Sequence, residues 1–200
     1  QQVFAPSVHA QNAAKRIAKL KSIQTYLNRK DNKQALIEAL RQDFRKHEVE
    51  TLLSELGVVL SHIRYVTSRL KRWMEPTRLP VPLSLTGMRN YTTYEPKGSV
   101  LIIAPWNYPF NLTLIPLIYA ISAGCTAVVK PSEYTPATTA FIDQMLSDLF
   151  DGREVKVVTG EGETSAFLTT LPFDHIFFTG SPAIGKKVMA AAARNLTSVT

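Results

Sequence analysis

The sequence predicts an α/β fold in which a doubly wound parallel sheet is preceded by a set of helices. Up to Gly98 the apolar residues recur at helical spacing, whereas from Ser99 onward short apolar runs alternate with helical segments. Short β-branched and aromatic runs between helices are typical of parallel strands that are covered on both faces. A chain of 200 residues with 45% hydrophobic composition is long enough to bury a sizeable core.

Residues 1–72 are expected to form an N-terminal helical segment in which each helix buries one face. Asp31 is followed three residues later by Gln34, and this capping-box spacing predicts the start of the second helix. The three apolar patterns are Ile17, Leu20 and Leu27; Leu36, Leu40 and Phe44; and Leu52, Leu56, Val59, Leu60, Ile63, Val66 and Leu70.

Residues 73–98 are expected to form a connector with extended segments. Four prolines interrupt the helical pattern in this stretch, and alternation at Met88, Tyr91 and Thr93 indicates a strand. From Ser99 the pattern is strand then helix, repeated several times, which predicts parallel βαβ units in residues 99–200. The predicted strands are residues 100–104, 127–130, 155–159 and 175–179.

Charge and cysteine content limit the classes of function. The net charge of +7 belongs to the first half, since residues 1–98 hold 17 Lys and Arg against 8 Asp and Glu. These cations lie opposite apolar helix faces without interleaved aromatic residues, so we interpret them as solvated faces and expect no nucleic-acid partner. The single Cys125 excludes an intramolecular disulfide, no leader segment is evident, and no apolar segment reaches about 20 residues. We therefore expect a cytoplasmic protein with no membrane span.

The turn after the first predicted strand carries the most informative motif. Ala104, Pro105, Trp106 and Asn107 follow the buried run directly. Ligands bind outside the carboxyl ends of strands in open parallel sheets, so the Asn107 amide is well placed to donate a hydrogen bond to a substrate. The alternative is a proline-bounded turn in which the Asn bonds to its own backbone.

The turn after the second predicted strand offers one cation and one carboxylate. Lys130 and Glu133 are suited to bind the two hydroxyls of a ribose, the Lys donating and the Glu accepting. The alternative is an exposed turn in which Ser132 or Thr135 caps the following helix.

Two glycine-containing turns follow the other strands. Gly180 and Ser181 open a helix whose N-terminal amides form an anion site, and Gly185 follows within its first turns. The spacing is similar to a P-loop, but Lys187 stands where a P-loop needs Ser or Thr, which disfavours an ATPase or GTPase. Gly160 and Gly162 permit close approach of a flat ring, although a plain turn is equally compatible with them.

Taken in order, these motifs resemble the aldehyde dehydrogenase superfamily, in particular its class 3 branch of fatty and aromatic aldehyde dehydrogenases. The resemblance is carried by APWNYPF at 104–110, AGCTAVVKPSE at 123–133 and FFTGSPAIGKKVMAAAA at 177–193. It implies the Rossmann-like sheet of this family, with residues 99–200 as the NAD(P)-binding portion. It also implies that the connector at 73–98 supplies strands for a homodimer.

The resemblance implies specific roles for residues of this sequence. Asn107 matches the side-chain donor to the oxyanion, and no metal is implied. Cofactor contacts, to NAD or NADP, are implied for Ala104, Pro105 and Trp106 along the cofactor path, Lys130 and Glu133 at the ribose, Gly160 and Gly162 near the adenine, and Gly180, Ser181, Ile184 and Gly185 at the pyrophosphate.

The implied reaction is NAD(P)-dependent oxidation of a small-molecule aldehyde to a carboxylic acid through a Cys thiohemiacetal and a thioester. The family's nucleophilic Cys and general-base Glu are expected beyond Thr200, so we expect these 200 residues to be an inactive N-terminal portion. Cys125 is interpreted as a buried structural thiol. Two alternatives stay open: an acyl-transferring reductase of the same superfamily, and a noncatalytic relative that serves as a binding or structural protein.

Overall fold

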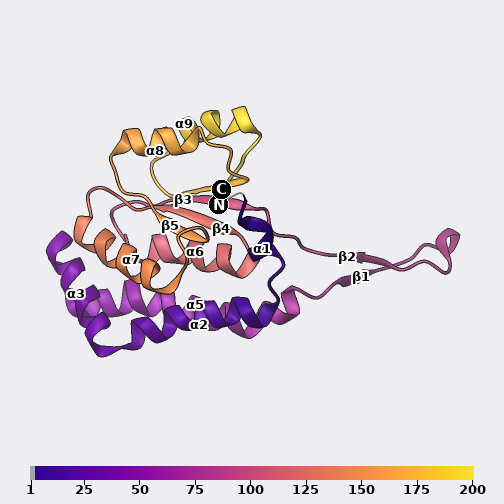
Figure 1. The fold of residues 1–200 in the computed structure, drawn as a ribbon, viewed down its shortest axis with the longest axis horizontal. Helices are drawn as coiled ribbons and strands as arrows, with labels where there is room; N and C mark the ends of the chain where they lie inside the picture. The colour runs from indigo at the N-terminus through magenta and orange to yellow at the C-terminus, as the bar shows by residue number, and fades with distance from the viewer. Residues whose placement is uncertain (1–2) are drawn as a thin grey trace.

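The computed structural model describes residues 3–200 and contains a five-stranded parallel sheet (Figure 1). Neighbouring strands are parallel throughout, so the predicted doubly wound α/β class is confirmed. The final strand, β7, was not predicted from the sequence. In spatial order the strands are β5 (Val155–Val157), β4 (Thr126–Lys130), β3 (Ser99–Ile103), β6 (His175–Phe178) and β7 (Ser198–Val199).

The order of the strands reverses beside β3. The chain lays down β3, β4 and β5 toward one edge and then returns to place β6 on the other side of β3. In open α/β sheets this reversal creates a crevice outside the carboxyl ends of the two strands that flank it. The crevice between β3 and β6 is therefore the expected place for a ligand.

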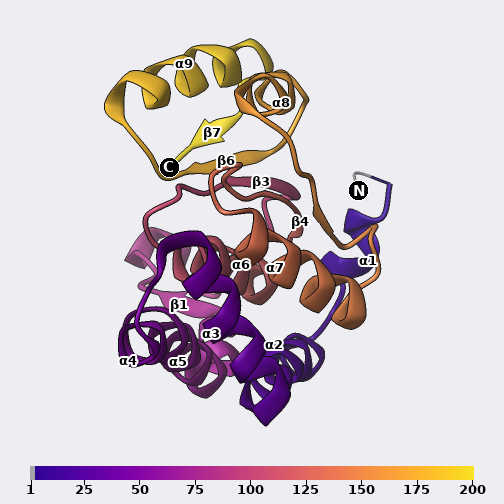
Figure 2. The ribbon, with the colours of Figure 1, turned by 90° about the vertical axis from the view of Figure 1, so that its left-hand side faces the viewer.

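Helices cover both faces of the sheet (Figure 1). On one face lie α6 (Asn111–Ala123) and α7 (Pro136–Leu149), and on the other lie α8 (Gly162–Thr169) and α9 (Pro182–Ala192). Figure 2 shows most of the N-terminal helices as a further layer below α6 and α7, on their side away from the sheet. One face is thus covered by two layers of helices and the opposite face by one.

The N-terminal layer confirms the three predicted helical patterns. The capping-box prediction was wrong, however, because α3 already begins at Lys30 and its N-cap residue, Arg29, makes no side-chain capping bond. Asp31 lies inside the first turn instead. The elements of this layer are α2 (Ala13–Asn28), α3 (Lys30–Phe44), α4 (Glu48–Glu50), a π-helical turn (Thr51–Leu56) and α5 (Gly57–Trp73). The short helix α1 (Ala5–His9) precedes them and lies apart from this layer, nearer the sheet (Figure 1).

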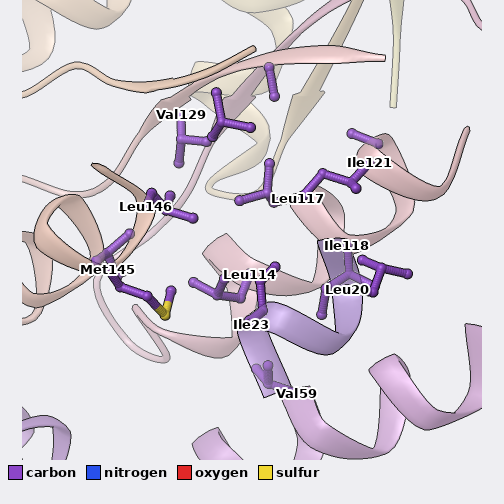
Figure 3. Close-up of a cluster of buried hydrophobic side chains, with 14 of the residues drawn as sticks. Leu20, Ile23, Val59, Leu114, Leu117, Ile118, Ile121, Val129, Met145 and Leu146 are labelled. Atoms are coloured by element: carbon purple, nitrogen blue, oxygen red, sulfur yellow. The ribbon is translucent and has the colours of Figure 1, made fainter. Parts of the chain in front are cut away.

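The main core lies between the sheet and the N-terminal layer (Figure 3). Helix α6 sits at its centre and is buried on nearly all sides, which explains its continuous apolar sequence. Cys125 belongs to this core and is only 3% exposed, in agreement with its interpretation as structural. Labelled core residues include Leu20, Ile23, Val59, Leu114, Leu117, Ile118, Ile121, Val129, Met145 and Leu146.

A two-stranded arm projects from the body of the molecule (Figure 1). It pairs β1 (Thr77–Leu79) antiparallel with β2 (Asn90–Thr92), and a 3₁₀ turn (Leu83–Leu85) lies near its tip. Leu83 and Tyr91 are among its exposed apolar side chains. Among residues 3–200, no helix has both the length and the apolar character that crossing a membrane requires.

Candidate active site at the carboxyl edge of the sheet

Three turns meet at the carboxyl edge of the sheet. We call them the asparagine turn (residues 104–110, after β3), the lysine turn (residues 130–135, at the end of β4) and the serine turn (residues 179–181, after β6). The Ala104 amide donates to the Lys130 carbonyl at 3.1 Å, and the Thr179 amide donates to the Ile103 carbonyl, also at 3.1 Å. The end of β3 is therefore hydrogen-bonded to the ends of both neighbouring strands.

The side chain of Asn107 is exposed in the asparagine turn. Within residues 3–200 it makes no hydrogen bond, so it does not close the turn through its own backbone. Ala104 is buried, Pro105 is half-buried and Trp106 is 54% exposed. The amide of Asn107 is consequently available to a ligand, while the strand end that carries it is fixed.

Groups from the N-terminal layer surround this turn. The ring of Phe44 stacks on Trp106 with 6.3 Å between centroids, and Lys46 Nζ lies 4.4 Å from the centroid of the Tyr108 ring. Glu55, fully buried, accepts a hydrogen bond from the backbone amide of Asn111 at 2.8 Å. These contacts were not predicted from the sequence, because nothing local links residues of the N-terminal helices to partners 56 to 62 positions away.

Burial raises the pKa of Glu55, and the hydrogen bond and charge of Lys46 act in the opposite direction without cancelling this effect. Lys46 Nζ lies 2.7 Å from Glu55 Oε1. The buried carboxyl therefore has a partner on each of its two oxygens.

Lys130 and Glu133 lie together in the lysine turn. Lys130 Nζ donates to Glu133 Oε2 at 2.9 Å, and Lys130 is 1% exposed whereas the Glu133 side chain is 31% exposed. Burial alone would raise the pKa of Glu133, but its bonds with Lys130 and with backbone, together with the Lys130 charge, lower it overall. The pair thus presents an ionised carboxylate at the carboxyl edge of the sheet, at the end of β4.

The helix after the lysine turn is capped from a distance. Thr135 is the N-cap residue of α7 but makes no side-chain capping bond, and Ser132 Oγ accepts from the Tyr134 amide instead. The carboxylate of Asp43, in α3, accepts from the amides of Ala137 at 3.1 Å and Thr138 at 2.8 Å. Neither the Ser132 nor the Thr135 side chain therefore caps α7, as the alternative interpretation of this turn required.

The serine turn caps its own helix. Ser181 is the N-cap residue of α9, and its Oγ accepts from the Ile184 amide at 3.4 Å. Gly180 has no positive φ, but a Cβ there would lie 2.5 Å from the Phe178 ring, so the glycine serves close packing. The Ser181 hydroxyl hydrogen stays free of this cap because the oxygen is the acceptor. Gly185 continues the first turns of α9, and its amide donates to the Ser181 carbonyl at 2.9 Å.

The two glycines after β5 differ from one another. Gly160 has φ +142°, and a Cβ there would collide with the Thr164 side chain. Gly162 begins α8 with open space around it. Only Gly160 is required by the backbone itself.

Cys125 lies far from this edge along the strand direction. It immediately precedes β4, so it belongs to the amino edge of the sheet, whereas Lys130 ends the same strand at the carboxyl edge. Among residues 3–200 no group of three or more His, Cys, Asp or Glu side chains is arranged to hold a metal ion.

Comparison with known proteins agrees with this geometry. Residues 2–200 match the protein family described as the aldehyde dehydrogenase family. The chain belongs to this family. It is 44% identical over 165 residues to the 4,4'-diaponeurosporen-aldehyde dehydrogenase of Staphylococcus aureus, covering 82% of this chain and 36% of that protein. It is 40% identical over 185 residues to human aldehyde dehydrogenase family 3 member B1, covering 92% of this chain and 39% of that protein.

Solved structures give the same result. The chain superposes on the substrate-bound state of Staphylococcus aureus AldH with a TM-score of 0.95 and 39% identity, covering 100% of this chain and 43% of that one. The resemblance to family 3 and to the fold of aldehyde dehydrogenases is confirmed. The chain spans about two fifths of the length of these relatives.

Proposed function

We propose that these 200 residues form the N-terminal, cofactor-binding portion of an NAD(P)-dependent aldehyde dehydrogenase that oxidises an aldehyde to a carboxylic acid. The membership in the family and the share of the relatives' length that is matched support this proposal. The single observation that carries it is the exposed, unpartnered Asn107 amide on a turn whose backbone is held from several sides.

Asn107 is the proposed oxyanion donor. When a thiolate adds to an aldehyde, negative charge develops on the former carbonyl oxygen, and an amide N–H that is already in place stabilises that charge without reorganising. Ordinary hydrogen bonds to other parts of the protein would compete with this role, and Asn107 makes none among the described residues. Cys125 is not proposed as the nucleophile, because it is buried at the other edge of the sheet.

The residues at the carboxyl edge fit a dinucleotide. Lys130 and Glu133 offer a donor and an acceptor for ribose hydroxyls, and the N-terminus of α9 offers amides and the Ser181 hydroxyl for a pyrophosphate. At the end of the neighbouring strand β5, Gly160 lets another group approach the backbone closely. Gly160 and Gly162 are both proposed to lie near the adenine. NAD or NADP, when bound there, supplies the hydride acceptor for the oxidation.

The exposed arm is proposed to pair two copies of the protein into a homodimer. Its apolar side chains Leu83, Met88 and Tyr91 are more than half exposed, which is typical of surfaces that bind a partner. We also propose a cytoplasmic location for the enzyme, because its one cysteine in this chain is a buried free thiol rather than part of a disulfide framework. The 200 residues on their own are proposed to lack turnover.

The Asn107→Ala variant tests the catalytic proposal in a full-length enzyme that contains this chain. Because the amide acts only as charge develops, kcat should fall by roughly 10²–10³ while the Kd for NAD stays nearly unchanged. Steady-state kinetics and a melting curve measure this. A variant with an unchanged melting curve and near wild-type kcat would remove Asn107 from the mechanism.

A further inference from the structure

A buried ion pair lies behind the asparagine turn and touches the helix that follows it. Glu55 is 0% exposed and Lys46 is 8% exposed. Glu55 Oε1 accepts a hydrogen bond from Lys46 Nζ at 2.7 Å, and Glu55 Oε2 accepts one from the Asn111 amide at 2.8 Å. The carboxylate thus connects the N-terminal layer to the first residue of α6, four positions after Asn107.

The same region contacts both residues that flank Asn107. Lys46 Nζ lies 4.4 Å from the centroid of the Tyr108 ring, and Phe44 stacks on Trp106 at an interplanar angle of 29°. Each contact is of a kind that favours a particular ring orientation. The asparagine turn is therefore held on each side of Asn107, while the Asn107 side chain itself has no partner among the described residues.

Two uncommon backbone features occur next to this pair. Arg45, between Phe44 and Lys46, ends α3 as its C-cap residue with φ +57°, a left-handed conformation that is common at helix ends but usually taken by glycine. Glu55 lies in the π-helical turn Thr51–Leu56, where a Cβ on Gly57 would come within 2.8 Å of the Leu52 carbonyl oxygen. Such features cluster at functional sites, where the surrounding structure maintains them.

Stability alone gives little reason for a buried pair of this kind. Removing two charges from water costs about as much as their attraction returns, so apolar residues of similar volume are often equally stabilising. A fixed pair with directional bonds does, however, determine where its partners lie.

We propose that Glu55 and Lys46 are positioning residues for aldehyde oxidation, because they hold the asparagine turn in the arrangement that places the Asn107 amide at the oxyanion. This inference rests on the proposed function of Asn107. Neither residue is assigned contact with substrate or cofactor. Their effect passes through the Asn111 amide and the rings of Tyr108 and Trp106.

The first test is Glu55→Gln in the full-length enzyme. Gln keeps an acceptor for the Asn111 amide but removes the charge that holds Lys46, so the turn should shift and kcat should fall about ten- to a hundredfold. The Kd for NAD, measured by calorimetric titration, should change less than twofold. An unchanged kcat in a folded Glu55→Gln enzyme would overturn the proposal.

Glu154→Gln is the matched control. It breaks the pair between Lys19 and Glu154, which is also largely buried but contacts none of the three turns. This variant should lower the melting temperature and leave kcat unchanged at temperatures where the enzyme is folded. A kcat loss equal to that of Glu55→Gln would mean that general destabilisation explains both, against the proposal.

A double-mutant cycle distinguishes positioning from a separate structural effect. If Glu55 acts through Asn107, then adding Glu55→Gln to Asn107→Ala should lower kcat no further. Multiplied losses in the double variant would contradict the positioning role while leaving the oxyanion role intact. A normal kcat for Asn107→Ala alone would instead defeat the proposed function, and this inference with it.

Lys46→Met provides a second variant in case Glu55→Gln fails to fold. Met keeps an apolar stem beside Tyr108, and the remaining Glu55 can take up a proton because burial already raises its pKa, so no isolated charge is left inside. We expect a similar kcat loss and faster hydrogen exchange in peptides spanning residues 104–112. Wild-type kcat together with wild-type exchange would overturn the proposal.

Discussion

The three turns at the carboxyl edge of the sheet are anchored in two different ways. Helix α6, after the asparagine turn, donates a backbone hydrogen bond to the carboxylate of Glu55. Helix α7, after the lysine turn, donates two to the carboxylate of Asp43, and both carboxylates belong to the N-terminal layer. Helix α9, after the serine turn, is capped by its own Ser181. Two of the helices that follow the turns are thus tied to a distant layer of the molecule, and the third is capped by a residue of its own turn.

This difference indicates which parts of the site are rigid. A carboxylate at a helix N-terminus satisfies free amides and interacts favourably with the helix dipole, and here it also fixes the helix to a packed neighbour. Movement of the asparagine or lysine turn therefore requires movement of the N-terminal layer. The serine turn, proposed to bind phosphate, has no such bond to the N-terminal layer; the Thr179 amide ties it to the Ile103 carbonyl in the sheet instead.

The largest effect is expected for Asn107→Asp. A carboxylate on the rigid turn repels the developing negative charge and offers no donor, so kcat should fall by at least the roughly 10²–10³ expected for Asn107→Ala. Steady-state kinetics of the full-length variants provide the measurement. An Asp variant that is clearly more active than the Ala variant would indicate that Asn107 does not face the oxyanion.

Lys130→Ala should act on cofactor binding instead. Loss of a hydrogen bond from a charged donor should weaken binding of NAD or NADP by about 1–3 kcal/mol. Calorimetric titration of both dinucleotides measures the change. Identical dissociation constants in variant and wild type would remove Lys130 from the cofactor site, and a kcat loss without weaker binding would assign it to the chemistry.

Asp43→Ala and Ser181→Ala compare a distant cap with a local one. Loss of a capping acceptor typically costs about 0.5–2 kcal/mol of stability, and Asp43 should lie near the upper end because two amides lose their acceptor. Ser181→Ala should cost less, since its capping distance is 3.4 Å. Chemical denaturation of the two variants provides the ranking, and a larger loss for Ser181→Ala would reverse the distinction between the turns.

The smallest effect concerns pH and a residue at the opposite, amino edge of the sheet. Burial, assisted by the charge of Lys97, lowers the pKa of His175 below its usual 6.5. A lowered folded-state pKa means that His175 favours the folded state above pH 6.5 and that this contribution is lost as the pH falls through the folded pKa. Stability should therefore decline less steeply between pH 7 and 5 in His175→Gln than in wild type. Denaturation curves at several pH values show the difference, and identical slopes would contradict it.

Features that depend on local sequence were predicted well. The four predicted strands appear within two residues of their expected ends, and all three helical patterns in the N-terminal segment form helices. The start of a helix at residues 180–181 was also expected, and α9 begins at Pro182, but the capping role of Ser181 was not predicted, since Ser181 was singled out only as a hydroxyl donor for a phosphate. Hydrophobic period and turn residues are enough for such features, since neighbours in sequence determine them.

Features that depend on tertiary contact were missed or mispredicted. Asp43 and Glu55 accept hydrogen bonds from amides 94 and 56 residues later in the chain, and no local pattern connects them. Asp31 has the right spacing for a capping box, yet the helix already starts at Lys30, after a break of one residue at Arg29. The two-residue strand β7 forms only because β6 offers it an edge.

The central claim is that Asn107 is held rigidly and donates to the oxyanion during chemistry. Single-turnover formation of NADH, with saturating NAD and excess enzyme, tests it most directly, because product release cannot mask the chemical step. Asn107→Ala should slow this single turnover by roughly 10²–10³ with the same cofactor affinity and melting temperature as wild type. A single-turnover rate equal to that of the wild type would contradict the account.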